Sequence, residues 1–124
     1  MKTFKSNIFG DIPEPENFEE LINLISNNHQ KNIFNVFMWR GQSNIEWRVD
    51  HSAYRRLKLN SKEITEAEIV NYETSLLNQA THRGYRNQNG KILNDFELLA
   101  LLQHHGAATR LLDFTRNALI ALWF

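Results

Sequence analysis

The chain of 124 residues is long enough for one domain, and its 42% of apolar residues can bury a core. Lysine plus arginine and aspartate plus glutamate both number 14, so zero net charge gives no global attraction to nucleic acid or anionic lipid. The absence of cysteine excludes disulfides and thiolate metal sites, and the sequence shows neither a transmembrane run nor a signal peptide. We therefore expect a soluble cytoplasmic protein without a membrane partner.

Residues 1–16 are predicted to be a lead-in segment, with a short extended stretch around Phe4, Ile8 and Phe9, ahead of one domain spanning residues 17–124. The chain stops in ALIALWF, an apolar, helix-like run with no glycine or polar tail after it. Helices normally close with a glycine or a basic last turn, so we expect the domain to be incomplete at its C-terminal end.

A first helix is predicted directly after two prolines. Asn17 and Glu20 have the three-residue spacing of a capping box, and Asn27 and Asn28 are expected to end the helix. Apolar residues recur at the i, i+3, i+4 and i+7 positions of one helical face, namely Phe18, Leu21, Ile22 and Ile25.

A strand is predicted in IFNVFMWRG, residues 33–41, because this stretch is rich in β-branched and aromatic side chains. Arg40 stands at the end of this strand just before Gly41, which is an unusual place for a charge. Residues 47–49 are expected to form a second, shorter extended piece, and residues 51–57 a loop or turn.

The longest predicted helix covers residues 61–83, with Ser61 as its N-cap and Gly84 as its C-terminal stop. Its buried stripe is expected to consist of Ile69, Tyr72, Leu76 and Ala80. A polar turn follows, tightest at Asn89-Gly90.

A further helix is predicted from Asn94, which has a glutamate three residues on, to a stop at Gly106. Its sequence FELLALLQHH is apolar nearly all round, which favours a central, buried helix. Residues 107–113 are expected to be extended or looped, and Thr115 or Asn117 to open a last helix. The predicted class is therefore α+β, with a helix-rich N-terminal portion packed on a small β-sheet.

The stretch LLQHHGAATRLLDFT, residues 101–115, places many polar groups between leucines. Gln103, His104 and His105 fall in the last turn of the helix predicted to be buried, where an unpartnered polar group costs about 1–3 kcal/mol. Arg110 and Asp113 lie three positions apart and could pair. Either a polar clasp within the protein or a bound ligand satisfies these groups.

Other kinds of site have little support. The histidines at positions 29, 51, 82, 104 and 105 lack the i, i+4 spacing of a helical zinc pair, so no metal is expected. The sequence contains neither a G-x-S-x-G hydrolase elbow nor a phosphate-binding glycine loop.

The remaining signal is arginine. Arg40 and Arg110 are framed by apolar neighbours, and an arginine cannot discharge by losing its proton, so each needs an anion if it is partly buried. The anion is either an internal carboxylate or a ligand phosphate or carboxylate held by the planar fork. Hydroxyls at Thr109 and Thr115 would suit a phosphorylated ligand.

FMWRGQ (37–42), together with LALLQHHGAATRLLDFTRNALIALWF (99–124), resembles the FRG domain, a family named for an aromatic-Arg-Gly motif. The resemblance begins with Trp39, Arg40, Gly41 and Gln42, followed by Trp47, Ser52 and Arg55 or Arg56. It continues through Gln103, His104, Gly106, Thr109, Arg110, Leu111, Leu112, Asp113, Thr115, Asn117, Ala118, Ala121 and Phe124. His51, Ala108 and Phe114 stand where the family favours proline, proline and tryptophan, which removes no polar group.

The layout of this family is similar to the Arg-Ser-Glu class of ADP-ribosyltransferases, and its members occur mostly in bacteria and their viruses, in settings of conflict or defence. The resemblance implies that Arg40 would hold the phosphates or ribose of NAD, with Thr109 or Thr115 in the hydroxyl role. The catalytic glutamate of that class would stabilise an oxocarbenium-like ribosyl centre. We expect it beyond Phe124, so that this chain alone would bind without turnover.

Two functions follow, and whether the protein is an enzyme stays open. The first is an NAD- or nucleotide-binding, ADP-ribosyltransferase-like cleft, with a protein acceptor or partner among its candidate partners; the sequence does not identify the acceptor. Its catalytic residues would be Arg40, His104, Thr109 and Asp113, and its cofactor-binding residues Arg40, Gly41, Gln42, Gln103, His104, Thr109, Arg110 and Thr115. The alternative is a non-enzymatic module with a structural polar clasp and a protein or nucleic-acid partner. A third interpretation, RNA contact, would use Arg48, Arg55, Arg56 and Lys58.

Overall fold

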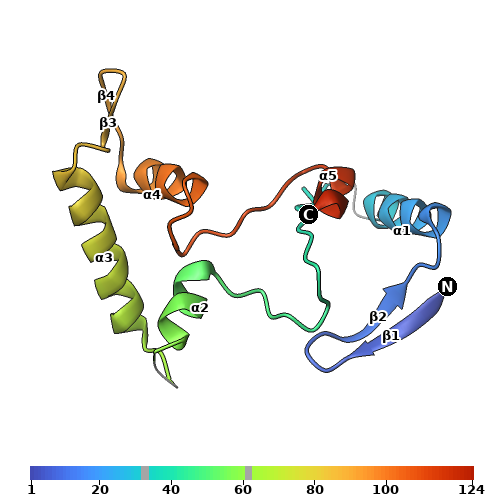
Figure 1. Cartoon of the computed structure of the whole chain (residues 1–124). Helices are drawn as coiled ribbons and strands as arrows, with labels where there is room; N and C mark the ends of the chain where they lie inside the picture. Colours follow the sequence, from blue (N-terminus) through green and yellow to red (C-terminus); the bar gives the residue numbers. More distant parts are fainter. Residues whose placement is uncertain (32–33, 61–62) are drawn as a thin grey trace. The chain divides into compact units, whose positions relative to one another are not determined.

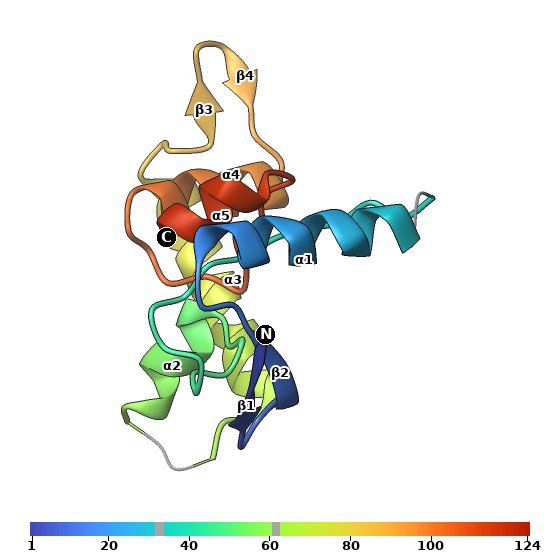
Figure 2. The ribbon, with the colours of Figure 1, turned by 90° about the vertical axis from the view of Figure 1, so that its right-hand side faces the viewer.

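The structure is a computed structural model that describes residues 1–31, 34–60 and 63–124. Helices and small antiparallel sheets together confirm the predicted α+β class. The elements belong to two compact units, residues 1–48 with 113–124 and residues 49–112 (Figures 1 and 2).

The first unit begins with a hairpin within the predicted lead-in. Strand β1 (Lys2–Ser6) pairs antiparallel with β2 (Gly10–Glu14). The Ser6 hydroxyl oxygen organises the turn by accepting hydrogen bonds from the amides of Ile8 (3.1 Å) and Phe9 (3.2 Å). The predicted extended stretch is therefore present, although Ile8 and Phe9 themselves lie in the turn.

Helix α1 (Phe18–Lys31) follows the hairpin. Asn17 Oδ1 accepts a hydrogen bond from the Glu20 amide (2.9 Å), as predicted, whereas the Glu20 carboxylate accepts from the amide one residue before Asn17 (3.0 Å). The prediction that Asn27 and Asn28 end the helix is wrong, since it continues to residue 31. Asparagine costs a helix only a fraction of a kcal/mol per residue, so two of them do not stop it.

The strand predicted at residues 33–41 does not form in the part that the structure describes, and Ile33 lies outside the described residues. Only Trp39 makes a bridge, antiparallel to Thr115, with N–O distances of 2.7 and 2.8 Å. β-branched and aromatic composition favours a strand only where a neighbouring strand supplies the pairing, and here one residue does so. The second predicted piece, residues 47–49, also forms no strand.

Helix α5 (Ala118–Trp123) belongs to the same unit and begins where Asn117 predicts it. Asn117 Oδ1 accepts hydrogen bonds from the amides of Leu119 (2.9 Å) and Ile120 (3.3 Å). These bonds satisfy two amide donors that the first turn of a helix cannot pair by itself.

The second unit opens with helix α2 (Ser52–Lys58), in the stretch predicted to be a loop. His51 is its N-cap, and the imidazole Nδ1 accepts a hydrogen bond from the Tyr54 amide (3.1 Å). A histidine does not predict a helix start, because Ser, Thr, Asp and Asn are the usual N-cap residues.

Helix α3 (Glu66–His82) begins later than predicted, with Thr65 as its N-cap in a complete capping box with Glu68. The predicted cap, Ser61, lies outside the described residues. Gly84 ends the helix at φ +84°, as predicted. Of the predicted stripe, Ile69 and Ala80 are buried, and Tyr72 and Leu76 are half-buried.

The Asn89-Gly90 turn connects strands β3 (Asn87–Gln88) and β4 (Lys91–Ile92). Both turn residues have positive φ angles, 52° and 81°, as a type I′ hairpin requires.

Helix α4 (Asp95–His104) has the predicted capping box at Asn94 and the predicted glycine stop at Gly106, where φ is +91°. The expectation of a central, buried helix is wrong. Leu98 and Leu99 are buried, but Phe96 is 67% exposed and the histidines of the last turn are exposed as well. A helix that is apolar all round therefore still presents one side to solvent here.

Among the described residues, the buried apolar core lies mostly in the second unit, where α3 contacts both α2 and α4. It consists of Ala53, Ile69, Ala80, Leu98, Leu99 and Ala108, with Ala121 in the first unit. The predicted single small sheet is instead two separate two-stranded hairpins, one in each unit. None of the helices within the described ranges combines the length and apolar character that a bilayer crossing needs.

Candidate functional site

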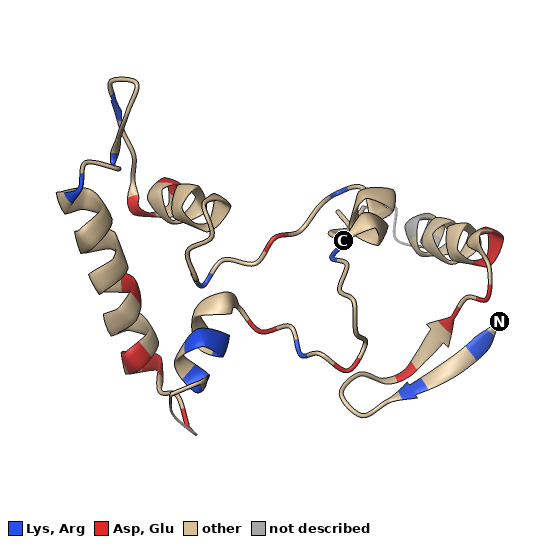
Figure 3. Cartoon of the chain, viewed as in Figure 1, with Lys and Arg blue, Asp and Glu red and all other residues tan. Residues whose placement is uncertain are grey.

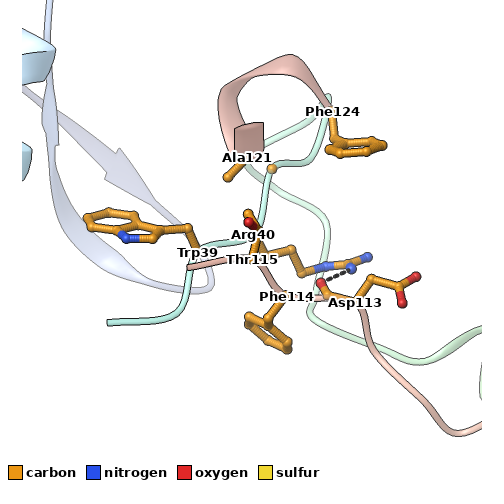
Figure 4. Close-up of a pocket in the computed structure, with 8 residues that line it drawn as sticks. Trp39, Arg40, Asp113, Phe114, Thr115, Ala121 and Phe124 are labelled. Atoms are coloured by element: carbon orange, nitrogen blue, oxygen red, sulfur yellow. Dashed lines mark hydrogen bonds between the residues drawn. The ribbon is translucent and has the colours of Figure 1, made fainter. Parts of the chain in front are cut away.

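Arg40 lines a hollow of about 360 Å³ that is built entirely from the first unit (Figure 4). The other residues that line it are Trp39, Gly41, Asp113, Phe114, Thr115, Ala121 and Phe124. The bridge between Trp39 and Thr115 joins the two segments that form its walls. The size is at the lower end of the roughly 300–1,000 Å³ usual for small-molecule sites.

The Arg40 guanidinium retains hydrogen-bonding capacity. Its Nη1 donates to the backbone carbonyl of Asp113 (3.1 Å), and within the described ranges no carboxylate forms an ion pair with it. A guanidinium has five N–H donors, and Arg40 is exposed. An anion that enters the hollow therefore meets a cation that forms no ion pair with a carboxylate of the described residues.

Gly41 allows two segments of the first unit to approach closely. A Cβ at this position would lie 1.9 Å from the carbonyl oxygen of Ala121 and 3.2 Å from the carbonyl carbon of Phe124. No side chain fits there, so the glycine after Arg40 is needed for α5 to contact this segment. The contact also brings Ala121 and Phe124 to the hollow.

Gln42 and Thr115 have roles in local loop structure. The Gln42 amide donates to the carbonyl oxygens of Asn44 (3.2 Å) and Trp47 (2.8 Å), so it fixes the loop after Arg40. Thr115 Oγ1 accepts a hydrogen bond from the Asn117 amide (3.1 Å), which leaves the hydroxyl proton able to donate.

In the second unit, Thr109 is only 1% exposed and holds three segments together. Its amide donates to Ser52 Oγ (3.0 Å), and its carbonyl accepts from the Ala53 amide (3.1 Å) and the Ser52 hydroxyl (3.3 Å). Its own hydroxyl donates to Gln103 Oε1 and accepts from the Leu111 amide (3.1 Å). These bonds are those expected of the structural clasp.

Arg110 forms ion pairs with Glu73 and Glu66 of α3, in place of the predicted pairing with Asp113. Its Nε and Nη2 donate to the two carboxylate oxygens of Glu73 (3.1 and 2.9 Å), and its Nη1 donates to Glu66 (2.5 Å). Figure 3 shows acidic residues on the first half of α3, the part of the helix to which Glu66 and Glu73 belong. The hydrogen bonds to Glu73 raise the pKa of Arg110, and Glu66 contributes in the same direction. The fork that would hold a ligand is occupied by carboxylates.

The structure changes the interpretation of the polar residues that end α4. His104 and His105 are exposed, with their rings edge to face at 5.3 Å between centroids, so solvent reaches both. The argument that burial forces them to find a partner is therefore wrong. Gln103 is half-buried and accepts from Thr109.

The predicted site residues divide between the two units. The structure brings Arg40, Gly41, Asp113 and Thr115 into one hollow, and Gln42 adjoins it in sequence. Gln103, His104, Thr109 and Arg110 belong to the other unit. Within the described part of the chain no three His, Asp or Glu side chains gather in a metal-binding group, and a metal-free site stays a prediction.

The sequence did not identify the hydrogen-bond partners of Arg110 and Thr109 in the second unit. Glu73 and Glu66 were assigned to no site, yet they fall on the same face of α3 as Ile69, at spacings of four and three residues. A glutamate within an apolar stripe is a signal that a buried or half-buried cation faces it. Ser52, the partner of Thr109, was singled out only by the family resemblance, which did not indicate the hydrogen bonds between the two residues.

These features define an α+β protein with a hollow in which Arg40 lies between aromatic side chains. The FRG domain model matches residues 35–124, which is most of the chain, so the protein belongs to the FRG domain family. No curated protein and no solved structure matches it.

Proposed function

We propose that the protein binds a nucleotide, with NAD as the candidate, in the hollow at Arg40. The observation that carries the proposal is the contrast between two arginines. Arg110 is neutralised by Glu73 and Glu66, whereas the described residues give Arg40 only the backbone carbonyl of Asp113. A planar guanidinium with available N–H groups is the protein's best match for a phosphate.

In this proposal Arg40 binds a phosphate of the nucleotide, and the Asp113 and Thr115 side chains bond the ribose hydroxyls. Transfer of ADP-ribose would break the bond between the nicotinamide nitrogen and the ribose carbon, and neutral nicotinamide would leave with the bonding electrons. An acceptor nucleophile would form a new bond to that carbon and release its proton to solvent. A carboxylate stabilises the oxocarbenium-like centre in between, and among the described residues that line this hollow Asp113 carries a carboxylate. A catalytic role for His104, which belongs to the other unit, stays a prediction. A role in bacterial or phage defence is part of the same proposal.

The second candidate function, a non-enzymatic interaction module, is favoured by the second unit. The polar groups of Thr109 and Arg110 form hydrogen bonds within the unit, as in a structural clasp. Their partners are Ser52, Gln103, Glu66 and Glu73. A partner protein or nucleic acid would then bind elsewhere, and the family-matching residues from Gln103 to Arg110 would stabilise the fold.

Calorimetric titration of the protein with NAD distinguishes the two functions. We expect saturable binding to the wild type and at least a tenfold loss in Arg40→Ala, because hydrogen bonds to charged groups contribute about 1.5–3 kcal/mol each. Arg83→Ala is the matched control, since Arg83 is an exposed arginine of the other unit. Absence of binding to the wild type, or equal affinity in Arg40→Ala, refutes the proposed nucleotide site.

A further inference from the structure

The hollow at Arg40 has aromatic walls that an anion site alone does not require. Phe114 is 47% exposed and Phe124 is 77% exposed, and both line the hollow with Arg40. In Figure 4 the two rings lie on either side of the Arg40 side chain. Ring faces beside a cation are therefore accessible to a ligand.

We infer that Phe114 and Phe124 are specificity-determining residues that stack on the planar ring of a nucleotide whose phosphate is bound by Arg40. The inference rests on the proposed function and adds the chemical class that the site selects. Aromatic side chains bind any base through its π-face, whereas a sugar phosphate offers no aromatic ring to stack on. The hollow should therefore prefer nucleotides to phosphates without an aromatic ring.

Two sets of backbone contacts, one on each side of Arg40 in sequence, position the side chains of Arg40, Phe114 and Phe124. Phe114 directly precedes Thr115, whose amide and carbonyl pair with Trp39, the residue before Arg40. Phe124 follows α5, and its amide donates to the Ala121 carbonyl (3.3 Å), the group that Gly41 approaches. The guanidinium that would bind the phosphate comes from residues 39–41, and the two aromatic rings come from residues 113–124. Backbone contacts join these two segments before and after Arg40.

The test compares NAD with two probes that lack an aromatic ring, ribose 5-phosphate and inorganic pyrophosphate, on the full chain. We expect Phe114→Leu and Phe124→Leu to weaken NAD binding on the order of tenfold, within the range found for loss of base–aromatic stacking. The same variants should bind the two non-aromatic probes as the wild type does. Phe114→Trp should keep the affinity for NAD, because indole also offers a ring face.

Phe96→Leu is the matched control, since Phe96 is exposed and belongs to the other unit. If the wild type binds NAD through Arg40 but both leucine variants bind it equally well, the inference is overturned while the proposed function stands. Equal losses for NAD and for the two non-aromatic probes also overturn it, since stacking would not be the cause. If NAD does not bind the wild type at all, both proposals fail.

Discussion

Arg110 spreads its guanidinium over Glu73 and Glu66, whereas Arg40 donates to the backbone carbonyl of Asp113. Residue type and apolar neighbours alone predict the same need for an anion at both positions. The difference arises from which side chains the folded chain brings close. Arg110 is therefore expected to contribute to stability, and Arg40 to ligand binding.

Gly41→Ala should destabilise the first unit and weaken binding at Arg40. The added Cβ would lie 1.9 Å from a backbone oxygen of α5, which cannot move like the end of a flexible side chain. Overpacking of this kind typically costs about 1–3 kcal/mol. Denaturant unfolding checks it, with Ser43→Ala, an exposed neighbour, as the control. A midpoint unchanged in Gly41→Ala would contradict the close contact with α5.

Thr109→Val should lower the free energy of unfolding by about 1–3 kcal/mol, because it keeps the shape but leaves the Leu111 amide and the Gln103 oxygen without the hydroxyl. Thr109→Ser should recover part of the loss. Thr74→Val is the control, since Thr74 is an exposed threonine of α3. Equal stability of Thr109→Val and wild type in thermal unfolding argues against the clasp.

At the scale of the element, four helix ends followed the sequence, whereas the equally local N-caps at His51 and Thr65 were not predicted. Asn94 and Asn117 each begin a helix, and Gly84 and Gly106 each end one, because cap, amide and carbonyl lie within a few residues of one another. The strand prediction failed at Trp39, where the single pairing partner is Thr115, far along the chain. Local composition contains no information about such a partner.

The N-cap of α2 predicts a pH-dependent stability. Burial lowers the pKa of His51 from its usual 6.5, and the nearby charge of Arg110 lowers it further. Neutral imidazole is needed, since Nδ1 accepts the Tyr54 amide. Because the unfolded chain takes up this proton first, the stabilisation is complete above about pH 6.5 and is lost as the pH falls through the lower folded-state pKa.

His51→Asn tests this expectation, since asparagine is a good N-cap that does not titrate. Melting temperatures measured from neutral to mildly acidic pH should fall more steeply for the wild type than for the variant. Parallel curves would show that protonation of His51 does not affect the helix.

For the whole molecule, the sequence predicted the α+β class and the family. It did not predict that the candidate site residues belong to two different units. The Arg110 partners are 37 and 44 residues away in sequence, and Ser52 is 57 residues from Thr109. Contacts between residues so far apart in sequence depend on tertiary packing, which cannot be predicted from periodicity or residue spacing. The hollow at Arg40 likewise joins residues 39–41 to 113–124.

The central claim is that Arg40, and not Arg110, meets the phosphate of a nucleotide. The most direct measurement is the side-chain Nε–H signals of the arginines, followed by ¹⁵N NMR during a titration with NAD. The signal of Arg40 should shift and saturate, while that of Arg110, which donates to Glu73, stays in place. An Arg40 signal that does not move at millimolar NAD, or an Arg110 signal that moves in its stead, would contradict the account.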